Sequence, residues 1–325
     1  MSGDSRQTQS EPGPPEDAAR PGDRVVDLAF RGLLWSVLRL PYAPRIRTFG
    51  WVTERLAMAS RFGRRIEENL DLVYPEMDKA ARRTLARRSA NNSGRLLIEN
   101  YSGPELAARM NHVEPTGPGV AALAEAKEAG TPVLLLTGHF GNYEAARASL
   151  VARGYRVGGL YRPMRNPYFN AHYRATMERM GPPVFPQGRA GTKGLIAFLR
   201  SGGFAMLLND LYVGSGLELP FLGHPAMTST SAAEIAERVG ARAIPVWGIR
   251  QPDGLSFTVE VDAPLPEGDP VETTRAYNAA CEARIRAHPD QWYWIHRRWK
   301  VKWQRGAGDR PGLHPAQLPS RKSRL

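Results

Sequence analysis

The chain has 325 residues and a hydrophobic content of 42%, which is ample for a sizeable folded core. Its 44 basic and 32 acidic residues give a net charge of +12, so we expect an anionic partner such as nucleic acid, phospholipid head groups or an acidic protein. The one cysteine, Cys281, excludes an intrachain disulfide and lies in an alanine-rich stretch, which is typical of a buried, inert thiol.

The N-terminal region has the pattern of a polar leader followed by an amphipathic helix. Residues 1–23 are rich in Pro, Glu and Ser, and they predict a disordered leader without a secretory signal. Residues 25–40, VVDLAFRGLLWSVLRL, carry polar side chains near helical spacing and leave a wide apolar face. The uncharged run between Arg31 and Arg39 is far shorter than the roughly 18 residues that a membrane-spanning helix needs.

We therefore expect residues 24–65 to form a helical region that associates with a membrane surface without crossing it. Several arginines between positions 45 and 65 supply positive charge for anionic head groups. The alternative interpretation is that the apolar face of this region packs on the domain that follows.

The pattern from residue 66 to residue 305 predicts a single α/β domain, and residues 306–325 predict a basic disordered tail. Residues 66–110 have helical patterns. From about residue 120, helices alternate with short apolar strands, which favours a mostly parallel sheet flanked by helices. The predicted strands are PVLLLT, RVGGLY, FAMLL, ARAIPVWGIR and LSFTVEV, and the predicted helices include 143–153, 167–180, 191–200 and about 271–288.

The string TGHFGNYE joins a predicted buried strand to the helix that follows it. Asn142 is a favourable helix N-cap, and the preceding glycines allow a tight turn. The turn places His139 at the carboxyl edge of the sheet, where α/β proteins bind their ligands. Glu144 can then reach one imidazole nitrogen and fix its tautomer, while the other nitrogen takes a proton from a hydroxyl. The alternative is that Glu144 is only an acid favoured by the first turn of the helix.

No other signature of a nucleophile is present in the chain. There is no Gly-x-Ser-x-Gly string, no Cys/His spacing for a metal, and no dinucleotide-type glycine fingerprint. The string GRAGTKG has its glycines and lysine in the wrong order for a phosphate-binding loop. A histidine–carboxylate pair without a side-chain nucleophile indicates direct transfer, in which the substrate itself attacks.

Three further strings carry candidate binding residues. In YRPMRNP, Arg162 and Arg165 follow a strand and suit a phosphate or a carboxylate, although solvated loop charges would look the same. Asp210 follows the strand FAMLL, and we expect it to pair with one of those arginines. The aromatic and basic residues of QWYWIHRRWKVKW suit a lipid–water interface or a nucleic-acid surface.

The strings HFGNYE, YRPMRNP, NDLYVGSGLELPFLGHPAMT and WYWIHRRWK, in this order, resemble the bacterial lipid A late acyltransferases, the lauroyl and myristoyl acyltransferase family. The resemblance covers about residues 25–305. It implies a glycerolipid-acyltransferase-like α/β fold and an acyl thioester donor, either acyl carrier protein or acyl-coenzyme A. It also implies a hydroxyl of a membrane lipid as acceptor. The thioester is a co-substrate, so no cofactor and no metal are expected.

Carried over to this chain, the resemblance implies that His139 is the general base, that Glu144 is its partner, and that Arg162 and Asp210 bind a head group or the donor. It implies a peripheral or monotopic enzyme at the cytoplasmic face of the bacterial inner membrane. A lipid A precursor is the expected acceptor, with lysophospholipids and glycolipids as alternatives. The acceptor stays open because Leu211 follows Asp210, where the family often has glutamine or a charged residue.

Three other functions compete with acyl transfer. A nucleic-acid-binding protein would explain the net charge, but the basic residues are spread along the chain and no nucleic-acid-binding motif is present, so no nucleic-acid partner is expected. A non-catalytic lipid-binding relative and a hydrolase that uses water as acceptor both remain open.

Overall fold

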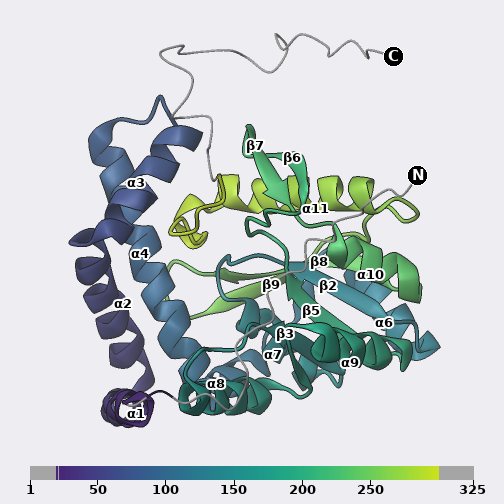
Figure 1. Cartoon of the computed structure of the whole chain (residues 1–325), viewed down its shortest axis with the longest axis horizontal. Helices are drawn as coiled ribbons and strands as arrows, with labels where there is room; N and C mark the ends of the chain where they lie inside the picture. The colour runs from purple at the N-terminus through teal and green to yellow at the C-terminus, as the bar shows by residue number, and fades with distance from the viewer. Residues whose placement is uncertain (1–19, 21, 300–325) are drawn as a thin grey trace, which may run out of the picture.

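The computed structural model of the chain describes residues 20 and 22–299, and a seven-stranded sheet forms its centre (Figure 1). The predicted leader lies outside the described residues except at its last few positions, and the predicted tail lies wholly outside them. In spatial order the strands are β1 (Pro115–Thr116), β9 (Phe257–Val261), β8 (Arg242–Arg250), β2 (Val133–Thr137), β5 (Phe204–Leu208), β3 (Val157–Tyr161) and β4 (Val184–Pro186).

Every pairing in this sheet is parallel except the one between β8 and β9. The predicted mostly parallel sheet is thus confirmed. β2 lies between β5 and β8 and is buried along its whole length, because helices cover both faces of the sheet. This double burial explains why its sequence, VLLLT, is continuously apolar and does not alternate.

Helices pack on both faces of the sheet, and alternate residues of β2 contact them. Leu134 and Leu136 belong to one core cluster, and Val133 and Leu135 belong to a second cluster on the opposite face. The helices that contribute to the first cluster include α9 (Arg189–Arg200), α10 (Ser231–Val239) and α11 (Pro270–Ala287), together with residues of the N-terminal helices. Those of the second are α5 (Gly103–Met110), α6 (Val120–Ala129) and α7 (Tyr143–Ala152), and α8 (Pro167–Met180) joins it at its last residue.

Four N-terminal helices lie together on one side of the sheet, at the left of Figure 1. They are α1 (Asp23–Leu38), α2 (Tyr42–Met58), α3 (Arg61–Val73) and α4 (Lys79–Tyr101). α2 packs closely along α4 because Gly94 has no side chain, and a Cβ there would lie 2.5 Å from Thr53 Oγ1. The predicted boundary between the N-terminal region and the domain, at residue 66, falls inside α3.

The outer surface of α1 and α2 exposes large apolar side chains, which are Val25, Val26, Leu28, Leu33, Trp35, Trp51, Val52 and Leu56. Asp27 and Leu34 of α1 are instead buried, so α1 packs on the domain by one face only. None of the helices in the described part of the chain is sufficiently long and apolar to pass through a membrane.

Some strands were not predicted. The segments β6 (Leu217–Phe221) and β7 (His224–Thr228) form an antiparallel hairpin separate from the main sheet, and Figure 1 shows it projecting beside α11. β1 and β4 are also unpredicted. They are short edge strands of two and three residues, too short to produce a recognisable pattern.

Candidate active site

His139 lies in the loop between β2 and α7, as the sequence predicts. Asn142 is the N-cap of α7, and its side-chain oxygen accepts a hydrogen bond from the Ala145 N–H at 3.1 Å. Gly141 has a positive φ of 52°, and a Cβ at this position would lie 2.0 Å from the Gly248 carbonyl oxygen. The turn therefore requires glycine, and it places His139 at the carboxyl edge of the sheet.

Asp210 holds the imidazole of His139. Its Oδ1 lies 2.8 Å from His139 Nδ1, and its Oδ2 accepts hydrogen bonds of 2.8 Å from the His139 backbone N–H and from Trp292 Nε1. The Asp210 side chain has 0% exposure. The predicted pairing of Asp210 with Arg162 or Arg165 is wrong, because its carboxylate is bonded to His139 and Trp292.

The charge of Asp210 sets the tautomer of His139. Burial by itself would raise the pKa of Asp210, but the charge and hydrogen bond of His139, with smaller effects of His296 and Trp292, hold that pKa well below its usual range. An ionised carboxylate can only accept hydrogen bonds, so Nδ1 carries the hydrogen and Nε2 is left as an acceptor. When the imidazole carries no charge, this tautomer can take a proton at Nε2.

Glu144 has a different partner from the one predicted. Its Oε2 accepts a hydrogen bond of 2.8 Å from Arg147 Nε, and both side chains are buried. The predicted contact between Glu144 and the imidazole is therefore corrected: Asp210 bonds to Nδ1, and Glu144 bonds to Arg147. The reason is local, because residues three apart on a helix lie on the same face. Glu144 nevertheless lines the same pocket as His139.

The C-terminal segment, residues 288–299, completes the site. Its residues were not assigned to the active site from the sequence. The His296 ring lies 4.7 Å from the His139 ring, between centroids, and the Tyr293 ring lies at 6.2 Å. The Tyr293 N–H donates to the His139 carbonyl at 3.0 Å. The string QWYWIHRRWKVKW was interpreted only as an interface, and its Trp292 and His296 gave no separate signal of a catalytic site. Lys300 and the residues after it lie outside the described part of the chain.

Burial, together with the neighbouring charge of His139, lowers the pKa of His296 to about 4, although Asp210 acts in the opposite direction. His296 is therefore neutral at neutral pH. Within the described residues its buried Nε2 has no hydrogen-bond partner.

A pocket of about 320 Å³ opens beside His139. Side chains of α2, α4, α7, α8 and the C-terminal segment line it, and most of the surface they contribute is apolar. Its volume is within the range of about 300–1,000 Å³ that is typical of ligand pockets. A mostly apolar pocket whose lining also includes His139, Glu144 and His296 suits a ligand with a long apolar portion and a reactive polar group.

Arg162 and Arg165 follow β3, and the side chains of both are exposed. Neither residue lines the pocket beside His139. Their predicted role in substrate binding therefore stays a prediction, separate from the His139–Asp210 pair.

Comparison with known proteins gives a clear family. Residues 22–301 match the model of the bacterial lipid A biosynthesis acyltransferases. The chain belongs to this family. The resemblance predicted from the four strings is thus confirmed, and the protein is an acyltransferase.

Relatives of this acyltransferase align along most of its length. It is 29% identical to the lipid A biosynthesis lauroyltransferase of Escherichia coli K12, across 83% of this chain and 90% of the relative. It is 27% identical to the lipid A biosynthesis palmitoleoyltransferase of the same organism, with the same coverage. It is 25% identical to a lipid A biosynthesis acyltransferase of Haemophilus influenzae, across 83% of this chain and 88% of the relative.

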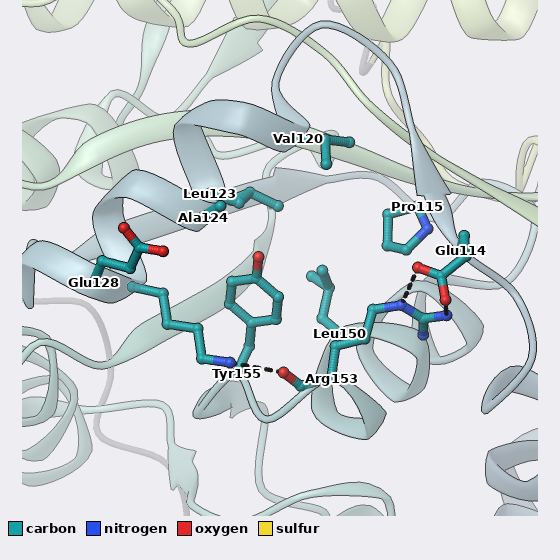
Figure 2. Close-up of a pocket in the computed structure, with 10 residues that line it drawn as sticks. Glu114, Pro115, Val120, Leu123, Ala124, Glu128, Leu150, Arg153 and Tyr155 are labelled. Atoms are coloured by element: carbon teal, nitrogen blue, oxygen red, sulfur yellow. Dashed lines mark hydrogen bonds and ion pairs between the residues drawn. The ribbon is translucent and has the colours of Figure 1, made fainter.

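A second hollow of about 470 Å³ lies at the other end of α7 in this acyltransferase (Figure 2). Arg153 forms an ion pair with Glu114, and Lys127 donates to the Arg153 carbonyl oxygen at 2.7 Å. α7 has ten residues and is therefore about 15 Å long, which separates this hollow from His139. Its lining residues include no histidine. In the described part of the chain no cluster of three or more His, Cys, Asp or Glu side chains could hold a metal ion.

Proposed function

We propose that this acyltransferase moves a fatty acyl chain from an acyl thioester to a hydroxyl of a lipid A precursor, with His139 as the general base. One observation carries the proposal: the buried, ionised carboxylate of Asp210 accepts a hydrogen bond from His139 Nδ1. This contact leaves His139 Nε2 as a hydrogen-bond acceptor beside an apolar pocket. The similar proteins are all lipid A biosynthesis acyltransferases, which supports the choice of acceptor.

In the proposed reaction the acceptor hydroxyl lies against His139 Nε2. His139 takes the hydroxyl proton as the oxygen attacks the thioester carbonyl, and the anionic Asp210 stabilises the imidazolium that forms. The tetrahedral intermediate collapses, the carbon–sulfur bond breaks, and the thiolate takes the proton back from His139. The products are an ester and a free thiol, and general base catalysis of this kind contributes about 10²- to 10⁴-fold in rate.

We further propose that the exposed apolar face of α1 and α2 lies in the cytoplasmic surface of the inner membrane, where lipid acceptors are found. Two arginines support this placement because each lies over an exposed indole, Arg39 over Trp35 at 4.3 Å and Arg55 over Trp51 at 5.3 Å. Aromatic rings next to cations suit the boundary between acyl chains and anionic head groups.

The test is acyl transfer by the detergent-solubilised protein. Labelled thioesters of acyl carrier protein and of coenzyme A would be offered with lipid A precursors, lysophospholipids and glycolipids. We expect label to move to a lipid A precursor and His139→Ala to lose that transfer by at least about 10²-fold. Full activity of His139→Ala would overturn the role of the base. Transfer only to another lipid would change the acceptor, and release of free fatty acid alone would favour hydrolysis.

A further inference from the structure

Arg147 is a buried cation that links two helices around the pocket. It bonds to Glu144 in the first turn of α7, and its guanidinium donates to the carbonyl oxygens of Met177 at 2.8 Å and Gly181 at 2.5 Å. Carbonyl groups at a helix C-terminus lack partners within the helix, and a cation is favourable beside them. Arg147 therefore joins the first turn of α7 to the C-terminal end of α8.

This end of α8 forms a wall of the pocket beside His139. Tyr173, Thr176, Met177 and Met180 of α8 all line it. The His139 side chain is 24% exposed, whereas Met180 is only 3% exposed, so Met180 is a buried part of the pocket wall. Met180 also packs tightly on α5, because a Cβ on Gly103 would lie 2.9 Å from Met180 Sδ.

We propose that the Glu144–Arg147 pair holds the end of α8 as the wall of an acyl pocket, so that Met177 and Met180 set the length of the transferred chain. The proposal rests on the proposed function, because it assigns the acyl chain to this pocket. Glu144 is then a positioning residue that acts through Arg147, and Asp210 is the residue that acts on the imidazole. A wall held by an ion pair and two carbonyl contacts resists the displacement that a longer chain requires.

The experiment is a competition among acyl thioesters from decanoyl to palmitoyl, with a lipid A precursor as acceptor and mass spectrometry of the products. We expect Met177→Ala and Met180→Ala to shift the products toward longer chains. The ratio of neighbouring products should change by about tenfold or more, since each methylene in an apolar pocket is worth roughly 10- to 200-fold. We expect Glu144→Gln and Arg147→Met to broaden the product distribution equally, and the double variant to behave like either single variant.

The pH dependence of kcat/KM separates positioning from direct catalysis. If Glu144 acts through Arg147, the acidic limb of the profile is the same in the wild type, Glu144→Gln and Arg147→Met. A limb displaced in Glu144→Gln alone would place Glu144 on the imidazole and overturn the proposal. The matched controls are Glu114→Gln and Arg153→Met, which break the ion pair at the far end of α7 (Figure 2) and should leave the product distribution unchanged.

Thermal unfolding of every variant checks that the protein is folded. If removal of one buried partner prevents folding, Arg147→Lys replaces it, because lysine keeps the charge but cannot span both carbonyl groups. An unchanged product distribution in Met177→Ala, Met180→Ala and Arg147→Lys would overturn this inference while leaving the proposed function intact. A wild-type protein that transfers no acyl chain from any thioester would overturn the proposed function first.

Discussion

At the scale of single residues, three donors converge on Asp210. It accepts from the imidazole and the backbone N–H of His139 and from Trp292, and these contacts keep a fully buried carboxylate ionised. The backbone contact matters because it fixes the loop, whereas the Nδ1 contact fixes the ring. Orientation and charge of the base therefore depend on one side chain.

Asp210→Asn tests that dependence. The amide has the shape of the carboxylate but lacks its charge, and its NH₂ group can donate to Nδ1 and shift the hydrogen to Nε2. We expect kcat/KM for acyl transfer to fall by about 10³- to 10⁴-fold, the order seen when a buried aspartate that orients a catalytic histidine is neutralised. Trp292→Phe removes only one donor to Asp210 and should lose much less. Asp210→Asn activity within a few-fold of wild type would contradict the role of the carboxylate.

His296 should make stability depend on pH. Its pKa in the folded state, about 4, lies below the value of about 6.5 expected after unfolding, so the unfolded chain binds a proton more readily between these values. This contribution to stability is complete above pH 6.5 and is lost as the pH falls toward 4, at roughly 1.4 kcal/mol per pKa unit. Urea unfolding at several pH values would measure it. His296→Gln should flatten the slope in this range, and an equal slope in the variant would contradict the assignment.

At the scale of elements, the register of two strands explains the site. β2 and β5 pair in parallel with Thr137 opposite Leu208. Counting two residues onward along each strand reaches His139 and Asp210, and the Asn209 N–H still donates to the Thr137 carbonyl at 3.0 Å. Two residues 71 apart in sequence are therefore adjacent because both leave the same edge of the sheet.

The exposed faces of α1 and α2 lead to a prediction for these two helices. Trp35→Glu and Trp51→Glu place a carboxylate where we propose lipid contact, and each removes a large apolar side chain. We expect binding to vesicles that contain anionic phospholipid to weaken by about tenfold or more for each change, since burying such a side chain is worth about 1.5–3 kcal/mol. Cosedimentation measures it. Leu217→Glu, at an exposed position of the β6–β7 hairpin, is the control, and equal losses in all three variants would argue against a specific face.

At the scale of the whole molecule, segments from both ends of the described chain enclose one edge of the sheet. α4 supplies one side of the pocket, and the C-terminal segment returns to the β2–α7 loop, where the Gly141 N–H donates to the Gln291 carbonyl at 2.9 Å. The net charge of +12 suits a protein that works beside anionic lipid. The site is thus assembled from parts of the chain that are remote in sequence and is complete only in the folded protein.

Local patterns in the sequence were sufficient for several features. The apolar run of β2, the glycine turn and the Asn142 cap predicted the strand–turn–helix unit that carries His139, because each depends on neighbouring residues. The order of the four strings predicted the family. The partner of His139 was not predictable in this way, because spacing along one segment favoured Glu144.

Only the tertiary structure decided which carboxylate contacts the imidazole. Glu144 is close in sequence, but its side chain bonds to Arg147 on the same helix face, whereas strand register brings Asp210 to Nδ1. Register depends on hydrogen bonds between strands that are far apart in the chain, and no local pattern specifies it. For the same reason, the buried contacts of Trp292 and the place of Met180 in the pocket wall became apparent only once the helices and the C-terminal segment were packed around the sheet edge.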